Sequence, residues 1–550
     1  MDRIDINKLE EMIEERKKVY RDDIDYFKKV GHEFLEGNKT SAEFKAVSGG
    51  MGVYAQRSQK EFMIRLRVLS GVLDYDTLQL IQEFANTYSL KTIHLTTRQA
   101  IQLHDLQFNE VISIMEKGLE QNLITRGGGG NYPRNVSLSP LSGVEKDEAF
   151  DVTPYAILVN KYFLSRMDTY KLPRKYKVAF SNNSSDTACA TATDLGFIAV
   201  KVDGENYFKV FIGGSLGVNG DISVPFDELV LPEEILYHIE ASLSLLVTEG
   251  DFENKSKARM RFIVKRMGKE AFLACYKEHL QKIKEKLKLE FSINEYDPGD
   301  KDIELSVLNT IMQPIDDLNK IHRIDEDIIK QPDVIAQKQG GLYTLVLHPQ
   351  GGLLKTEYLN KIVDFLKDVP DSSIRLSMEE SMYIRNLTAA QTLQLMDITK
   401  EIRQITRLEQ SISCIGIPTC QIGVQESQGL LNSILVYFKE NKFYDDVLPA
   451  LHISGCVNSC GRHQINEIGF QGKKKRVNDA AADAYALFIS GKTSETDTHL
   501  GKECGDLLAE SIPAFLYELA TSLKEKQIDF NTFIENNSKE FESILKPYLV

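Results

Sequence analysis

The cysteines of this chain concentrate in two short segments toward its C-terminal end. Four of the seven lie between Cys414 and Cys460, as a C-x5-C pair followed by a C-x3-C pair. Two loops that each bring two thiolates together can hold a four-cornered metal centre. The first spacing is longer than zinc loops usually have, and Gly416, Pro418 and Gly455 suit loops that wrap around a bulky inorganic group. The spacing therefore favours an iron–sulfur cluster and leaves a zinc site as the alternative.

A second set of residues able to do chemistry consists of cations and polar groups in the first half of the chain. Its members alternate along predicted strands, so that each group projects from one face, or they follow a glycine-rich loop. The groups are Arg65 with Arg67; Thr96, Arg98, Gln102 and His104; Arg134, which follows the glycines at 127–130; and Lys175 with Lys177. Clustered Arg and Lys donors predict a site for a strongly anionic ligand.

Length and composition limit the class of protein. A chain of 550 residues is too long for one core and predicts several domains. We find no N-terminal signal pattern and no apolar run of membrane-spanning length, so we expect a cytoplasmic protein without a membrane partner. In that compartment thiols stay reduced and clustered cysteines hold metal. The net charge of −14 argues against nucleic acid as a partner.

Hydrophobic periodicity predicts a unit that occurs twice. In the first copy we expect a strand over 62–69, a helix over 75–88, one long strand over 92–106 and a helix over 108–122. In the second copy we expect a helix over 355–367, a strand over 373–387 and a helix over 388–404. The segments L-T-T-R-Q-A-I-Q-L-H-D-L (95–106) and L-S-M-E-E-S-M-Y-I-R-N-L (376–387) align without a gap, with Glu379 at the position of Arg98.

A second kind of unit is also duplicated. Its first copy has F-S-N-N at 180–183, D-L-G-F at 194–197 and F-I-G-G at 211–214. The second has I-S-G-C at 453–456, E-I-G-F at 467–470 and F-I-S-G at 488–491. We call the first kind of unit A and the second kind B, and their repeats A′ and B′. Their order along the chain, A-B-A′-B′, predicts a duplicated α+β fold with pseudo-twofold symmetry, mixed α/β domains and a metal site in one half only.

This order predicts five regions. They are an N-terminal helical arm (1–48), a first repeat unit (49–125), a first anion-binding domain with a helical segment and a linker at 289–335 (126–335), a second repeat unit (336–407) and a cysteine-bearing domain ending in two amphipathic helices (408–550). The family resemblance described next implies that the units at 49–125 and 336–407 are ferredoxin-like half-domains.

Several motifs together resemble the sirohaem-dependent sulfite and nitrite reductase family. They are the cysteine pattern, T-T-R-Q at 96–99, P-R-N at 133–135 and L-P-R-K-Y-K at 172–177, in the family's order over residues 49–491. The resemblance implies a [4Fe–4S] cluster on Cys414, Cys420, Cys456 and Cys460, with Cys460 bridging to the iron of a central sirohaem. It also implies that the sirohaem contacts include Thr96, Arg98, Gln102, Arg174 and Asn458. The active-site cations that it implies are Arg67, Arg134, Lys175 and Lys177. One departure is Ser215, where the family's loop is expected to have glycine.

The resemblance implies a six-electron reduction of a small anion. Lys177 favours sulfite over nitrite, because a doubly charged anion gains more from an extra cation. Electrons would come from a separate donor protein, a ferredoxin or a flavoprotein or iron–sulfur subunit. The basic run 473–476 is either a docking site for an acidic ferredoxin or a solvated loop. Nitrite reduction is the alternative, and a non-catalytic, metal-stabilised binding module is the alternative from another class.

Overall fold

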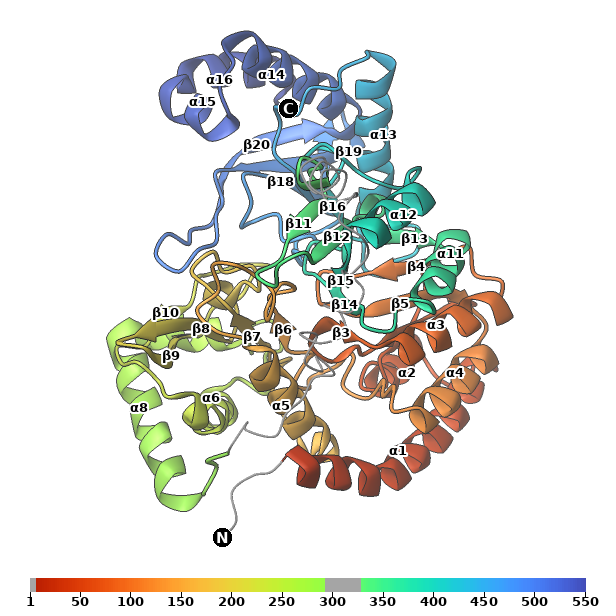
Figure 1. Ribbon diagram of the computed structural model, residues 1–550, viewed down its shortest axis with the longest axis vertical. Helices are drawn as coiled ribbons and strands as arrows, with labels where there is room; N and C mark the ends of the chain where they lie inside the picture. The colour runs from red at the N-terminus through yellow and green to blue at the C-terminus, as the bar shows by residue number, and fades with distance from the viewer. Residues whose placement is uncertain (1–5, 292–327) are drawn as a thin grey trace, which may run out of the picture.

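The computed structural model describes residues 6–291 and 328–550, so most of the expected linker lies outside the described residues. The chain begins with a long helix, α1 (Ile6–Leu35), and a short one, α2 (Ser41–Ser48), which starts at a capping box formed by Thr40 and Glu43. The helix α1 lies along the lower edge of the molecule (Figure 1). Its Tyr20 hydroxyl donates to the carbonyl of Leu164 at 2.6 Å and fastens the arm to the body. None of the described helices is long and apolar enough to cross a bilayer.

The A unit and its repeat A′ have the same order of elements. The first contains β1 (Val53–Ala55), β2 (Phe62–Leu66), β3 (Val72–Leu73), α3 (Tyr75–Thr87), β4 (Thr92–Leu95), β5 (Ile101–Leu106) and α4 (Phe108–Glu120). The second contains β11 (Val334–Ala336), β12 (Tyr343–Leu347), β13 (Leu353–Lys355), α11 (Thr356–Leu366), β14 (Ser373–Leu376), β15 (Met382–Leu387) and α12 (Ala389–Thr399).

The two units exchange a strand, which the sequence did not predict. The first sheet has the order β1-β2-β5-β4-β13 and the other β11-β12-β15-β14-β3. Leu354 of the second unit therefore lies opposite Ile93 of the first, and Leu73 of the first lies opposite Ile374 of the second. Since each five-stranded sheet is completed by the other repeat, the two half-domains are locked together.

The long strand expected over 92–106 is in fact a hairpin, so that prediction was wrong. Gln99 adopts a left-handed conformation with φ of 53°, and the backbone N–H and hydroxyl of Thr96 both donate to the carbonyl of Ala100. The chain reverses there, and Thr96 and Arg98 lie in the turn instead of on one strand face with Gln102. The repeat folds alike, with Glu380 at the position of Gln99 and φ of 57°.

The B unit and its repeat B′ also match. The first contains β6 (Ser137–Leu138), α5 (Thr153–Leu164), β7 (Val178–Ser181), β8 (Leu195–Val202), β9 (Glu205–Ile212) and β10 (Val224–Pro225). The second contains β16 (Ile412–Ser413), α13 (Ser427–Glu440), β17 (Leu451–Ser454), β18 (Ile468–Val477), β19 (Ala480–Ile489) and β20 (Lys502–Leu508). In both sheets the first three strands are parallel and the remaining neighbours antiparallel. The structure thus has the duplicated α+β architecture that the sequence predicted.

Helices complete the two B units. After β10 come α6 (Ile235–Glu249), α7 (Met260–Met267) and α8 (Lys269–Lys286), and the chain ends in α14 (Ile512–Lys526), α15 (Phe530–Asn536) and α16 (Ser538–Leu545), where two helices were expected. One apolar core joins the arm, both A units and B, and a separate core fills B′ and the C-terminal helices. The candidate site lies where these two bodies meet.

Candidate functional site

Three cations without protein partners lie in the segment that leads into β7. The side chains of Arg174, Lys175 and Lys177 are half-buried, and among the described residues none of them makes a hydrogen bond or ion pair. Burial, together with Arg259 and Arg134, lowers the pKa of Lys175 to about 7. Burial, with Arg98 and Lys175, also lowers the pKa of Lys177 far below its usual range. Cations that depress one another's pKa in this way make a strong site for an anion.

Arg98 and Arg134 border these lysines. The Arg98 guanidinium, held by Ser137 and the carbonyl of Asn135, has its pKa lowered to about 9 by burial and by Arg134. Arg134 donates to the carbonyls of Gly128 at 2.9 Å and Gly130 at 3.2 Å, so the glycine-rich loop orients it. The Nε atoms of both arginines are buried and have no hydrogen-bond partner among the residues that the structure describes. Buried donors left over in this way fit a pocket for a polyanion.

Asp194 is the carboxylate that holds this cationic cluster together. Its carboxylate is fully buried and accepts two hydrogen bonds from the Arg259 guanidinium, at 2.8 and 3.3 Å. It also accepts a hydrogen bond from the backbone N–H of Lys177 at 2.9 Å. Arg259 was not among the predicted site residues, because the carboxylate that it pairs with lies 65 positions away in the sequence. The neighbouring Arg261 donates to the Ser215 hydroxyl, so that the unexpected serine is 2% exposed and held within the loop.

Arg65 and Arg67 do not serve the same site. The Arg67 guanidinium is buried and donates to the carbonyls of Pro133 and Arg134 and to Asn160, so it supports the backbone that carries Arg134. Such a position does not support the substrate contact expected of Arg67. Arg65 instead donates to the carbonyl of Gly128 at 2.7 Å, the same acceptor that Arg134 uses. We therefore place Arg65 at the anion site in its stead.

Three further predicted sirohaem contacts, Thr96, Gln102 and Asn458, have different surroundings. The Thr96 hydroxyl donates a hydrogen bond to the carbonyl of Ala100 within the hairpin turn. The buried Gln102 accepts from Arg65 at 2.6 and 3.0 Å and donates to His104 at 3.2 Å in the amide orientation that these partners require. Thr96 therefore stabilises the turn that carries Arg98, and Gln102 orients Arg65. Asn458 is exposed, and its amide donates to the Cys456 thiol at 3.4 Å.

The four cysteines come together as a group at the edge of the other body. The charge of Cys460 raises the pKa of each of the other three thiols, after the larger effect of burial, which brings Cys414 to about 12. The Cys414 thiol accepts the N–H of Gly455 at 3.1 Å. Within residues 6–291 and 328–550, no three His, Cys, Asp or Glu side chains lie close enough to hold a single ion.

Two contacts join the cationic half of the site to the thiol half. The Thr97 hydroxyl, in the turn beside Arg98, donates to the carbonyl of Cys460 at 2.8 Å. The negative charge of Cys460 also counters part of the fall in the pKa of Lys175. Gly217, in the loop that holds Ser215, donates its N–H to Gln464 at 2.7 Å. The anion site and the cysteines therefore lie next to each other.

The pseudo-symmetric counterpart of this site is closed by its own ion pairs. Glu379, at the position of Arg98, pairs with Arg462 and lies 3.5 Å from His452. Burial opposes ionisation of Glu379, but Arg462 outweighs it and holds the pKa of this carboxyl well below its usual range. Arg462 also donates to Cys189 at 3.0 Å. Because Glu379 and Arg462 neutralise each other here, the residues that the structure describes offer an anion site at Arg98 and none at its pseudo-symmetric counterpart.

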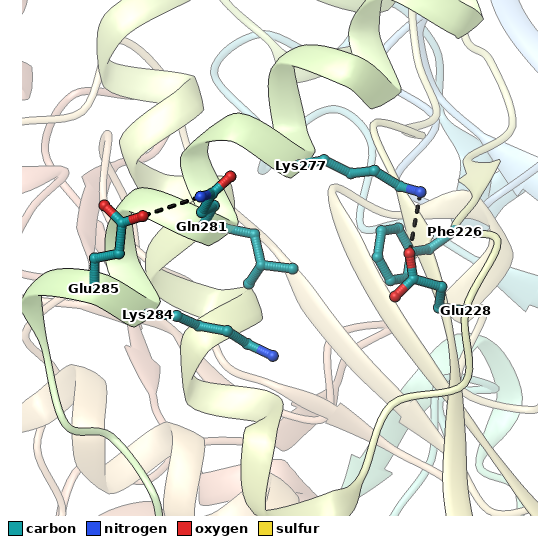
Figure 2. Close-up of a pocket in the computed structure, with 7 residues that line it drawn as sticks. Phe226, Glu228, Lys277, Gln281, Lys284 and Glu285 are labelled. Carbon is teal, nitrogen blue, oxygen red and sulfur yellow. Dashed lines mark hydrogen bonds and ion pairs between the residues drawn. The ribbon is translucent and has the colours of Figure 1, made fainter.

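An open hollow on α8 is a separate feature with different chemistry (Figure 2). Lys277 pairs there with Asp227 and Glu228 at 2.8 and 3.1 Å, and Lys284 pairs with Glu234 at 2.6 Å. Its cations are therefore already neutralised, and the hollow does not compete with the cationic cluster as an anion site.

Comparison with known proteins identifies the family to which this fold and this site belong. Residues 129–284 match the nitrite and sulphite reductase 4Fe-4S domain, and residues 54–121 and 335–402 match the nitrite/sulfite reductase ferredoxin-like half domain, so the two models together cover more than half of the chain. The chain is 24% identical over 529 residues to a ferredoxin–nitrite reductase of Synechococcus elongatus, covering 94% of this chain and 96% of the relative. It is 23% identical to the sulfite reductase [NADPH] hemoprotein beta-component of Geobacillus thermodenitrificans, covering 80% and 78%.

A solved structure supports the fold. The NirA protein of Mycobacterium tuberculosis superposes with a TM-score of 0.74 at 20% identity, over 90% of this chain and 91% of that one. The chain belongs to the nitrite and sulfite reductase family. It is therefore an oxidoreductase whose cofactors are a sirohaem and a [4Fe–4S] cluster.

The residues present fit both cofactors. Sirohaem carries many carboxylates, and Arg174, with the spare Nε donor of Arg98, supplies charge for them, which leaves Lys175 and Lys177 to a second anion. The four thiols, with backbone N–H groups directed at Cys414, Cys420 and Cys456, suit an iron–sulfur cluster.

Proposed function

We propose that this chain reduces sulfite to sulfide. The observation that carries the proposal is the pair Lys175 and Lys177, half-buried side by side without a carboxylate of their own. Asp194 binds the backbone of Lys177 and the guanidinium of Arg259, so the lysine ammonium groups stay available. A doubly charged anion gains more from this surplus than a singly charged one.

The cations have two tasks in this proposal. Lys175, Lys177, Arg134 and Arg65 hold the anion by charge-assisted hydrogen bonds. Lys175, with a pKa of about 7, can also donate a proton near neutral pH as oxygen leaves as water. When bound, sirohaem and the cluster supply a ligating iron and a route for six single electrons. Cys414, Cys420, Cys456 and Cys460 would hold the cluster, and Cys460 would join it to the sirohaem.

We propose a ferredoxin-type protein as the electron donor. Support comes from relatives named as ferredoxin-dependent, among them the Synechococcus elongatus nitrite reductase and the sulfite reductase [ferredoxin] 1 of Mycolicibacterium paratuberculosis, which is 23% identical over 86% of this chain and 83% of its own length.

Nitrite reduction to ammonia is the second candidate. It is favoured by the first two relatives, both named as ferredoxin-dependent nitrite reductases, of which the chain covers 96% and 88%. The same cations bind nitrite, and the reduction again takes six electrons. The two candidates differ in how strongly substrate binding depends on Lys177.

Steady-state turnover of sulfite and nitrite, with electrochemically reduced methyl viologen as the donor, tests the proposal. We expect a higher kcat/KM for sulfite. Two unit charges at 4 Å attract by about 1 kcal/mol in water and about 4 kcal/mol near a protein surface. Lys177→Asn should therefore lower the sulfite-to-nitrite ratio by about tenfold or more. Lys171→Asn, at an exposed position of the same segment, is the matched control. A wild-type preference for nitrite that Lys177→Asn leaves unchanged would overturn the proposal.

A further inference from the structure

A surface of the N-terminal half is fastened directly onto the first cysteine loop. In the turn between β1 and β2, the backbone N–H of Arg57 donates to the carbonyl of Thr419 at 3.3 Å, and its guanidinium donates to Gly423 at 3.1 Å. These contacts flank Cys420 on both sides. The same turn is tied to α2, because the Ser41 hydroxyl donates to Gln59 at 3.0 Å. The turn and α2 therefore form the outer wall beside Cys420.

This wall presents exposed cations with no ion-pair partner. Lys45, Arg57 and Lys60 are exposed, and in the described part of the chain no carboxylate lies within ion-pair distance of any of them. The nearest carboxylates in sequence, Glu43 and Glu61, are bound instead to the hydroxyls of Thr40 and Ser58. Lys45 also lies near the cluster loop, since its charge opposes the rise that burial causes in the pKa of Cys420.

An exposed apolar side chain lies next to these cations. Ile422, two residues after Cys420, is 55% exposed, and Pro418 in the same loop is exposed as well. We call Lys45, Arg57, Lys60 and Ile422 the cysteine-loop patch. An apolar centre bordered by charges that steer a partner is the usual composition of a transient protein interface.

The four cations of the basic run at 473–476, the other candidate for docking, are all engaged by three carboxylates of the same sheet and its hairpin turn. Lys473 and Lys475 both pair with Asp506 at 2.8 Å, and Lys474 pairs with Asp483 on the neighbouring strand. Arg476 pairs with Asp479 at 3.0 Å. Four cations that already have carboxylate partners attract an acidic protein weakly, so the run stabilises the β18–β19 hairpin.

We propose that the cysteine-loop patch is the docking surface for an acidic, one-electron carrier protein of the ferredoxin type. This inference rests on the proposed function and names where its donor binds. The chain carries a net charge of −14, so an acidic donor is repelled by most of the surface and attracted only where unpaired cations gather. Docking there brings the donor against the loop that carries Cys420.

Two double variants of equal charge test the inference. Lys45→Ala with Lys60→Ala removes two unpaired cations from the patch, and Lys474→Ala with Arg476→Ala removes two paired cations from the basic run. The measured quantities are the KM for photochemically reduced ferredoxin at low and high salt, and turnover with reduced methyl viologen. We expect the patch variant to raise the ferredoxin KM about fivefold at low salt, an effect that salt suppresses. The control should change it less than about twofold.

The outcomes separate this inference from the proposed function. Equal effects of the two variants on the ferredoxin KM would overturn the docking surface, as would a larger effect of the control. Loss of methyl viologen turnover in the patch variant would also overturn it, because the patch would then support the cysteine loop itself. A wild-type enzyme that accepts electrons from methyl viologen and none from ferredoxin refutes the donor. No sulfite turnover with methyl viologen refutes the proposed function.

Discussion

Replacing Asp194 with asparagine should weaken the fold more than any exposed charge change. The Asp194 and Arg259 side chains are 1% and 6% exposed and lie 2.8 Å apart. Asp194 also accepts the backbone N–H of Lys177 at 2.9 Å. Removing one partner of a buried ion pair leaves the other charge uncompensated, which costs about 3–5 kcal/mol. Asparagine has the same shape, so the change isolates the charge.

An exposed pair provides the matched control. Asp497 and Lys492 also lie 2.9 Å apart, but both side chains are more than half exposed. Asp497→Asn should therefore change the free energy of unfolding far less than Asp194→Asn does. The free energy of unfolding is measured by urea titration followed by circular dichroism, since the chain contains no tryptophan to report by fluorescence.

A double variant tests the reasoning further. Adding Arg259→Met to Asp194→Asn removes both partners, so much of the lost stability should return, and the two changes should couple strongly in a double-mutant cycle. If the free energy of unfolding of Asp194→Asn lay within about 1 kcal/mol of the wild-type value, or if the two changes were additive, the assigned role of Asp194 would be wrong.

Three further predictions follow from individual side chains. With nitrite, whose charge is constant near neutral pH, kcat/KM should fall as pH rises above about 7, because Lys175 then loses the proton that binds the anion; Lys175→Gln should flatten this limb, and an unchanged profile would exclude Lys175. Burial raises the pKa of Glu380 to about 8, so the stability that its neutral carboxyl contributes is lost as pH rises toward 8. In urea titrations, the free energy of unfolding should fall less between pH 5 and pH 8 for Glu380→Gln than for the wild type. An equal fall in the two proteins would show that the Glu380 carboxyl is ionised in the folded state. Cys460→Ser should disturb both the sirohaem absorption and the iron content, with Cys275→Ser as the control, and two intact cofactors would rule out a bridge.

The duplication could be predicted from sequence because short motifs kept their register. The glycines of D-L-G-F and E-I-G-F show why they persist: a Cβ on Gly196 or Gly469 would lie 2.0 or 1.9 Å from a backbone carbonyl, that of Ala190 or His463. The strand exchange could not be predicted, since β3 and β13 are two and three residues long and pair with the other repeat.

The functions of individual cations were harder to predict than their presence. The alternation of side chains along a strand predicted Arg65 and Arg67 on one face, but the Arg67 guanidinium donates a hydrogen bond to Asn160 on the distant helix α5. Arg259 pairs with a carboxylate 65 positions away, which no local pattern indicates. The run at 473–476 looked free until strand pairing brought Asp483 and Asp506 against it. In each case a contact distant in sequence decides which charges remain available.

The central claim is that one cofactor pair lies between the cationic cluster and the cysteine group. It is tested most directly by the absorption spectrum of the purified enzyme together with its iron, zinc and acid-labile sulfide content. We predict sirohaem bands and an iron-to-sulfide ratio of about five to four, from one haem iron and a four-iron, four-sulfide cluster. Stoichiometric zinc without tetrapyrrole absorption would contradict the account.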